Sequence, residues 1–129
     1  MISKYAKKTE NIMYLIFRII LGFLFAMHGA TKIGLIGKTP MTGLMLIVGI
    51  GEILVGLGIL LGFLVRHAAI GGAIIMIGAW IKVHLPNGIN PMANQGELSL
   101  LFLIAFLIVF AMGPGNFSLE KALFKKELC

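Results

Sequence analysis

A lone carboxylate, Glu52, lies near the middle of the longest apolar run of this sequence, residues 41–65. A run of about 25 residues is long enough to cross a bilayer with some tilt. A charged side chain at that depth costs roughly 2.5–3.5 kcal/mol on insertion scales, so it normally faces the interior of a helix bundle and has a partner. Six other ionisable residues lie at comparable depth and are the candidate partners: Arg18, His28, Lys32, Lys82, His84 and Glu97.

The composition is that of a protein that crosses the membrane several times. The chain has 129 residues, of which 59% are hydrophobic and 12% are charged, and its mean hydropathy is +1.02. Soluble domains carry about 25% charged residues. We therefore expect residues 1–129 to form one domain in the cell membrane. The net charge of +6 gathers mostly at the two ends, which predicts contact with anionic lipid and no nucleic-acid partner.

The single cysteine and the first thirty residues exclude several classes. Cys129 is the last residue, whereas a disulfide-exchange enzyme needs a cysteine pair and a prenylation box needs its cysteine four places from the end. We expect an inert thiol. The basic start and the apolar stretch after it resemble a secretory signal, but Arg18 interrupts that stretch and residues 27–30 lack a small–x–small cleavage pattern. A retained first helix is expected.

Four apolar segments predict an all-α fold, a four-helix transmembrane bundle whose helices are unbroken. They cover residues 11–30, 41–65, 67–85 and 97–112, and backbone facing lipid must be helical. The second and third segments form a tight hairpin with Arg66 at its turn. After Pro114, residues 116–121 begin a short amphipathic helix, capped by Asn116 or Ser118, that anchors to the lipid surface.

Basic residues orient the bundle in the membrane. Seven of them fall on one side of a four-span chain and three fall on or near the other, which places both termini in the cytoplasm. The seven are Lys4, Lys7, Lys8, Arg66, Lys121, Lys125 and Lys126, and the three are Lys32, Lys38 and Lys82.

Small residues supply the expected helix contacts. Helical spacing puts Gly49, Glu52 and Gly56 on one face of the second helix, and Gly58 and Gly62 form a GxxxG motif. The third helix has the same spacing of small residues at Ala68/Gly72 and Ala69/Ala73. Because lipid provides no hydrophobic drive between helices, such residues favour close backbone approach, here mostly within the chain.

Depth along the helices separates two groups of polar residues. At 1.5 Å per residue, Arg18 lies roughly 9 Å and Glu52 roughly 19 Å from the cytoplasmic end. Their side chains lean in opposite directions, so Arg18 should snorkel toward the inner interface; a direct Arg18–Glu52 ion pair is the alternative. His28, Lys82 and His84 lie about 21–25 Å up by the same rise.

We therefore expect a polar pocket that opens outward. His28, Lys32, Glu52, His84 and Glu97 should surround it, with His28 bonded to Glu52 directly or through one water. Simpler roles exist for some members: Lys32 and Lys82 can reach the outer headgroups, and His84 and Trp80 suit the interface. His67 is expected to be a surface residue.

The order of several short motifs resembles that of DoxX-type membrane proteins over nearly the whole chain. The departure is Glu120, where such proteins usually have Asp. The resemblance implies a four-helix bundle in the cell membrane. It also implies association with redox proteins, because relatives include the membrane part of a thiosulfate–quinone oxidoreductase. It supports the polar residues named above as the site. The motifs are Arg18-x-x-x-Gly22, His28-Gly29-x-x-Lys32, Gly51-Glu52, Gly56, Leu61-Gly62, Arg66, His84, Glu97, Gly113-Pro114-Gly115 and Ser118-Leu119.

Three classes of function and one minor reading follow. The leading hypothesis is a membrane component of a redox system, with no intrinsic cofactor, that binds a quinone or another small redox-active molecule. His28 or Glu52 would bond to a quinone oxygen and Lys32 or Lys82 would stabilise the anionic form, while a membrane or membrane-associated oxidoreductase partner supplies electrons. The alternatives are a transporter or binding protein for a small acid or sulfur species, and a structural subunit without a ligand. No metal is expected, since His28 and His84 alone are weak support for a metal or haem site.

Overall fold

The computed structural model describes residues 1–37 and 39–125, apart from the side chain of Glu120. Lys38, Lys126 and Cys129 lie outside the described residues. Every regular element of the described part is helical, which confirms the all-α prediction. In chain order the elements are α1 (Ile2–Lys32), α2 (Leu44–Leu61), α3 (Val65–Ala79), η1 (Trp80–His84), η2 (Leu85–Asn87), α4 (Glu97–Met112) and α5 (Leu119–Phe124).

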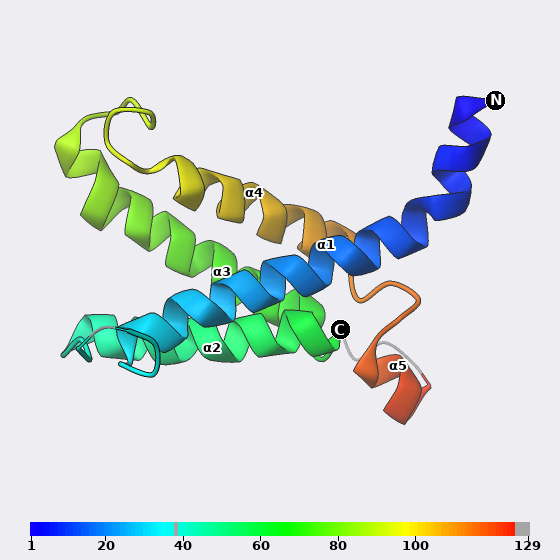
Figure 1. The fold of residues 1–129 in the computed structure, drawn as a ribbon, viewed down its shortest axis with the longest axis horizontal. Coiled ribbons are helices and arrows are strands. Elements are labelled where there is room, and N and C mark those ends of the chain that lie inside the picture. The colour runs from blue at the N-terminus through cyan, green and yellow to red at the C-terminus, as the bar shows by residue number, and fades with distance from the viewer. Residues whose placement is uncertain (38, 126–129) are drawn as a thin grey trace.

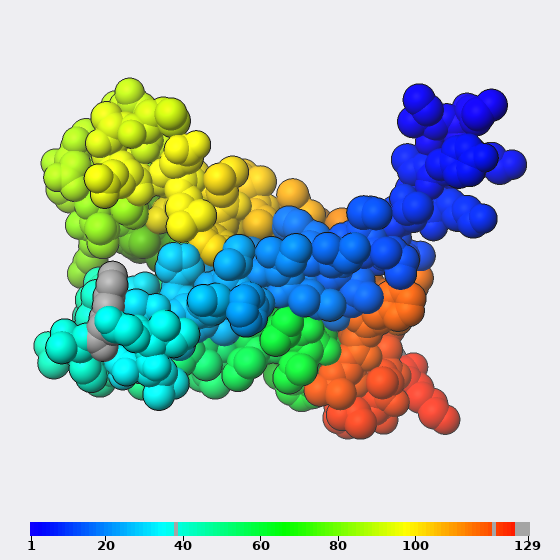
Figure 2. Space-filling view, viewed as in Figure 1, coloured from blue at the N-terminus to red at the C-terminus, as the bar shows by residue number. Residues whose placement is uncertain are grey.

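The four long helices form two antiparallel hairpins, α1–α2 and α3–α4 (Figure 1). The hairpins meet at the end that carries the α2–α3 turn, α5 and the start of α1. We call this the Arg66 end. They separate toward the other end, which carries the α1–α2 and α3–α4 loops and which we call the Lys32 end. Figure 2 shows a notch between the hairpins at the Lys32 end.

Three helical segments are long and apolar enough to cross a membrane: Ile2–Lys32, Leu44–Leu61 and Val65–Asn87. The fourth, α4, has 16 residues, is as apolar as the others and packs along α3. The protein is therefore an integral membrane protein whose exposed apolar side chains contact lipid. The predicted bounds of the fourth segment, residues 97–112, agree with the structure.

Two predicted boundaries are wrong in informative ways. The first helix begins at Ile2 instead of residue 11, and its exposed first turns project beyond the bundle (Figures 1 and 2). The second ends at Leu61 because Gly62 takes a left-handed conformation, φ 76°. Gly62 is thus a helix cap, and it also allows a close approach within the chain, because a Cβ on it would lie 2.7 Å from the Ser118 Cα. Of the two expected caps of α5, Ser118 is the one that accepts a hydrogen bond, from the Lys121 amide.

The third segment is not an unbroken helix. After Ala79 the chain forms a π-helical turn, Trp80–His84, and then a 3-10 turn, Leu85–Asn87. The Leu85 amide donates to the Trp80 carbonyl, five residues back. Pro86 contributes to this change, because it has no N–H to continue the α-helical bonds. π-helical turns occur frequently at functional sites.

Glycines let α1 and α2 approach closely. A Cβ on Gly22 would lie 2.6 Å from the Gly56 carbonyl oxygen, and one on Gly56 would lie 2.6 Å from the Ala26 amide nitrogen. One on Gly49 would lie 2.7 Å from the Lys32 Cβ. Gly49, Glu52 and Gly56 are all buried on α2, so the predicted shared face is confirmed.

The hydrophobic core fills the Arg66 half of the bundle. Its most deeply buried members come from all four long helices and include Phe25, Ile59, Val65, Phe106 and Val109. The aromatic rings of α1 and α4 interlock at the inner limit of this core, with Phe25 edge-on to Phe106 at 4.7 Å between centroids. Beyond these rings the two hairpins diverge.

Candidate functional site

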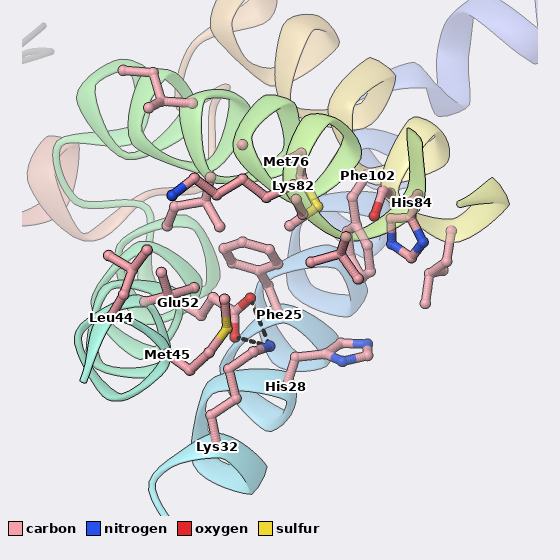
Figure 3. A pocket seen from close by; sticks show the side chains of 18 of the residues that line it. Phe25, His28, Lys32, Leu44, Met45, Glu52, Met76, Lys82, His84 and Phe102 are labelled. Carbon is pink, nitrogen blue, oxygen red and sulfur yellow. Dashed lines mark hydrogen bonds and ion pairs between the residues drawn. The ribbon is translucent and has the colours of Figure 1, made fainter. Parts of the chain in front are cut away.

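A cavity of about 600 Å³ lies between the hairpins in the Lys32 half of the bundle (Figure 3). All four long helices and η1 contribute to its wall. The wall is mostly apolar, and Phe25, Met76 and Phe102 are its buried members from the core side. Cavities of this size and character commonly hold small molecules. Five of the seven sequence-predicted site residues line it: His28, Lys32, Glu52, Lys82 and His84.

The Glu52 carboxylate and the Lys32 ammonium form an ion pair at this wall. Lys32 Nζ donates to both carboxylate oxygens, at 3.0 Å to Oε1 and 2.9 Å to Oε2. The Glu52 side chain is 3% exposed and that of Lys32 is 21% exposed. Lys32 therefore supplies the counter-charge that the carboxylate needs at membrane depth, and the pair presents both a donor and an acceptor to the cavity.

Among the described residues, no direct hydrogen bond joins His28 to Glu52, whose two carboxylate oxygens accept from Lys32; a bridge through one water stays a prediction. In Figure 3 the His28 ring points away from the carboxylate. It instead stands edge-on to Phe102, with 5.6 Å between centroids. The first helix offers two cations one turn apart, and the lysine takes the carboxylate because its longer chain reaches past Gly49. His28 remains at the cavity wall, available to a ligand.

Lys82 and His84 reach the cavity from the π-helical turn. Figure 3 shows the Lys82 side chain extending toward the α2 side, away from His84. His84 Nδ1 lies 3.2 Å from the carbonyl oxygen of Asn94. Asn94 is buried and ties the α3–α4 loop together, donating to the Gly88 carbonyl and accepting from the Gly96 amide. This loop thus fixes one nitrogen of His84.

The remaining two predicted site residues lie elsewhere. Glu97 is exposed and faces a smaller depression formed with Pro91, Met92, Gln95, Leu98 and Leu101. Its position at the start of α4 turns it away from the cavity, so including it in the pocket is wrong. Arg18 is also absent from the cavity wall and lies at the Arg66 end, as the depth argument predicts.

Arg18 belongs to a second, closed polar cluster. It is 2% exposed; its NH1 donates to the Pro114 carbonyl, and its NH2 lies close to the backbone at Gly62. Tyr14 Oη donates to the neighbouring carbonyl of Gly113. Two residues of α1 thereby hold the segment that follows α4. The alternative prediction, a direct pair between Arg18 and Glu52, is wrong.

Sequence reasoning missed the residues that shape the cavity. A buried hydroxyl, Ser99, lies in its wall one turn before Phe102. A serine inside an apolar segment is the signal that would have found it, since such residues often face a partner helix or a site. Methionines 41, 45 and 76 also line the cavity, and their flexible side chains adapt to varied ligands.

These features define a small multi-span membrane protein with a polar site inside the bundle. The sequence profile of the DoxX family matches residues 13–85, which is more than half of the chain. The chain belongs to the DoxX family.

Two proteins from Haemophilus influenzae are similar to this chain. One uncharacterized protein is 32% identical over 119 aligned residues, covering 84% of this chain and 89% of its own. A second uncharacterized protein is 31% identical over 62 residues, covering 48% of this chain and 41% of its own. No solved structure matches the chain.

Proposed function

We propose that this protein is a membrane component of a redox system that binds a quinone, or a similar small redox-active molecule, in the cavity between its hairpins. The observation that carries the proposal is the contrast within one cavity wall. Most of the wall is apolar or aromatic, whereas the Lys32–Glu52 pair, His28 and Ser99 supply hydrogen-bonding groups. A flat apolar ring with carbonyl oxygens fits that combination.

The polar groups have distinct parts to perform in this proposal. A quinone supplies two-electron redox chemistry when bound. Lys32 Nζ and the His28 ring are positioned to donate hydrogen bonds to a ligand oxygen, and Lys82 adds positive charge at the cavity. Glu52 and His28 are the groups able to exchange a proton with it. The redox electrons come from a membrane or membrane-associated oxidoreductase partner in this proposal.

Binding of a soluble ubiquinone analogue to the protein in lipid nanodiscs tests the proposal. We expect Glu52→Gln to weaken binding at least tenfold, because the carboxylate holds Lys32 Nζ, the donor to the quinone oxygen, and a charged hydrogen bond is worth about 1.5–3 kcal/mol. Glu97→Gln is the matched control, a carboxylate outside the cavity, and should bind like wild type. Equal effects of the two variants, or no binding by the wild-type protein, would contradict a quinone site here.

A second candidate, binding or transport of a small acid or sulfur anion, is favoured by one observation. The cavity wall carries two lysines, Lys32 and Lys82, but one carboxylate, Glu52, which leaves an excess positive charge when the histidines are neutral. Lys82→Gln distinguishes the candidates. It should weaken binding of a neutral quinone less than twofold but that of an anionic ligand about tenfold.

We also propose that the Arg66 end faces the cytoplasm. The start of α1, the α2–α3 turn and α5 lie together at that end (Figure 1), and they carry most of the basic residues. Reporter fusions after Cys129 and within the α1–α2 loop should fall on opposite sides of the membrane. The same side for both would contradict the four-span topology, and the reverse assignment would contradict this orientation.

A further inference from the structure

The boundary between α2 and α3 is closely packed near the Arg66 end and open near the Lys32 end. Near the Arg66 end the helices touch: a Cβ on Gly58 would lie 3.3 Å from the Ala68 Cβ, and one on Gly71 would lie 3.3 Å from a Val55 methyl. One turn further, a Cβ on Gly51 would lie 3.4 Å from an Ile75 methyl. The two helices are therefore in van der Waals contact up to the level of Ile75.

The contact ends at Gly78. This residue lies one turn after Ile74 and Ile75 and lines the cavity, yet a Cβ added to it would meet nothing within 4 Å. The facing residues of α2 at this level, Leu44 and Val48, also line the cavity. The boundary between the two helices thus opens into a gap that connects the cavity with the outside of the bundle. We call this gap the α2–α3 opening.

The α2–α3 opening faces lipid. Gly78 follows Val65, the start of α3, by 13 residues, which places it roughly 20 Å along a span whose hydrocarbon region is about 30 Å thick. The rim is apolar and exposed, with Leu44 52% and Ile74 64% exposed. Lys82, one turn beyond Gly78, lies where its ammonium can reach the headgroups.

Aromatic rings lie at the opposite flank of the cavity. Phe102 contacts both Phe25, at 5.4 Å between centroids, and His28, at 5.6 Å. These contacts join α1 to α4 beside the polar groups. A molecule held by the Lys32–Glu52 pair has an apolar exit between α2 and α3, where Leu44 and Ile74 line the cavity and are also exposed.

We infer that the ligand is an amphiphile with one long hydrocarbon chain, whose head is held at Lys32 and Glu52 and whose chain leaves through the α2–α3 opening into the bilayer. This inference rests on the proposed function and narrows it to lipid-soluble, long-chain quinones. A cavity of about 600 Å³ holds a drug-sized body, so the remainder of a long chain must continue outside. The ligand accordingly enters from the bilayer and not from water.

Narrowing the opening tests this inference. Gly78→Leu places a side chain in open space, so the protein should fold normally; replacing a helical glycine also favours the helix. Affinities of the variant and the wild type are compared in nanodiscs for two probes, tail-less ubiquinone and its decyl-chain analogue. We expect Gly78→Leu to weaken decyl-chain binding at least tenfold and to weaken tail-less binding by a much smaller factor.

The control and the contrary outcomes are distinct. Ala111→Leu adds the same bulk to an exposed position on α4, remote from the cavity wall, and should change neither affinity. Equal loss of both probes in Gly78→Leu, or loss of neither, overturns the inference while leaving the proposed function intact. Failure of the wild-type protein to bind either probe overturns the proposed function, and this inference with it.

Discussion

Two charged residues of this protein are buried to the same degree and are used in opposite ways. Arg18 and Glu52 are each 2% exposed. Arg18 donates to a backbone carbonyl at Pro114 and packs against the turn at Gly62, where the helices converge. Glu52 is held by Lys32 alongside an open cavity, where the hairpins diverge.

The difference shows that burial of a charge does not by itself identify a site. Bonds to backbone carbonyls tie an arginine to the fold and leave it no role toward a ligand. A pair of side chains can rearrange, and a neighbouring cavity gives a ligand access to it. The Arg66 end therefore ties the helices together, whereas the Lys32 end places an ion pair beside a cavity.

The largest expected effect is loss of stability when Arg18 is replaced. Arg18→Met keeps much of the volume but removes the donor to the Pro114 carbonyl, and loss of a buried, charged hydrogen-bonding group costs roughly 3 kcal/mol. Thermal unfolding in detergent should show a lower midpoint, with ligand binding per folded molecule unchanged. Lys8→Met, at an exposed position of the same helix, is the control. An unchanged unfolding midpoint for Arg18→Met would show that Arg18 does not stabilise the fold.

Glu52→Gln should destabilise the protein less, by roughly 1–2 kcal/mol, because Lys32 is partly exposed and can turn toward water. Adding Lys32→Met should recover part of that stability, since the uncompensated cation is then gone. Ligand binding should remain lost in the double variant. Recovery of binding together with stability would show that the pair serves the fold and not the ligand.

Tyr14→Phe removes the hydroxyl that donates to the Gly113 carbonyl and should cost about 1 kcal/mol. Binding should not change, because Tyr14 lies in the closed cluster. Chemical denaturation and ligand titration on the same sample separate the two effects. Weaker ligand binding by Tyr14→Phe, without loss of stability, would show that the Arg66 end influences the ligand site.

The smallest effect is expected for His67→Ala. His67 is exposed at the start of α3, and surface substitutions of this kind usually change stability by less than about 0.5 kcal/mol. His28→Ala, in the cavity wall, should weaken ligand binding about tenfold. Similar binding by the two histidine variants would argue against a role for His28.

The fold was largely predictable because the bilayer imposes strong constraints. Apolar runs of spanning length must be helical, and small residues at helical spacing mark the faces that pack. The errors fall where local backbone geometry decides. Gly62 ends α2 through its left-handed conformation, and the chain before Pro86 leaves the α-helix after Ala79, whereas the predicted segment extends to residue 85.

The site was only partly predictable. Depth along each helix predicted one pocket surrounded by His28, Lys32, Glu52, His84 and Glu97, and the structure places the first four of these at one cavity, together with Lys82. Depth carries no information about rotation around the helix axis at the ends of a span. Glu97 has a suitable level for the pocket but projects from the exposed face of α4.

The sequence alone determined that this is a membrane-embedded helical protein with a carboxylate that needs a partner, because hydropathy and the cost of a buried charge depend on local composition. Only the tertiary structure decided which cation becomes that partner. His28 and Lys32 lie one turn apart, within the error of any depth estimate. The close approach of α1 to α2 selects Lys32, whose side chain passes over Gly49. A Cβ added to Gly49 would lie 2.7 Å from the Lys32 Cβ. The splaying of the hairpins beyond Ile75, which creates the cavity, likewise depends on contacts between segments far apart in the chain.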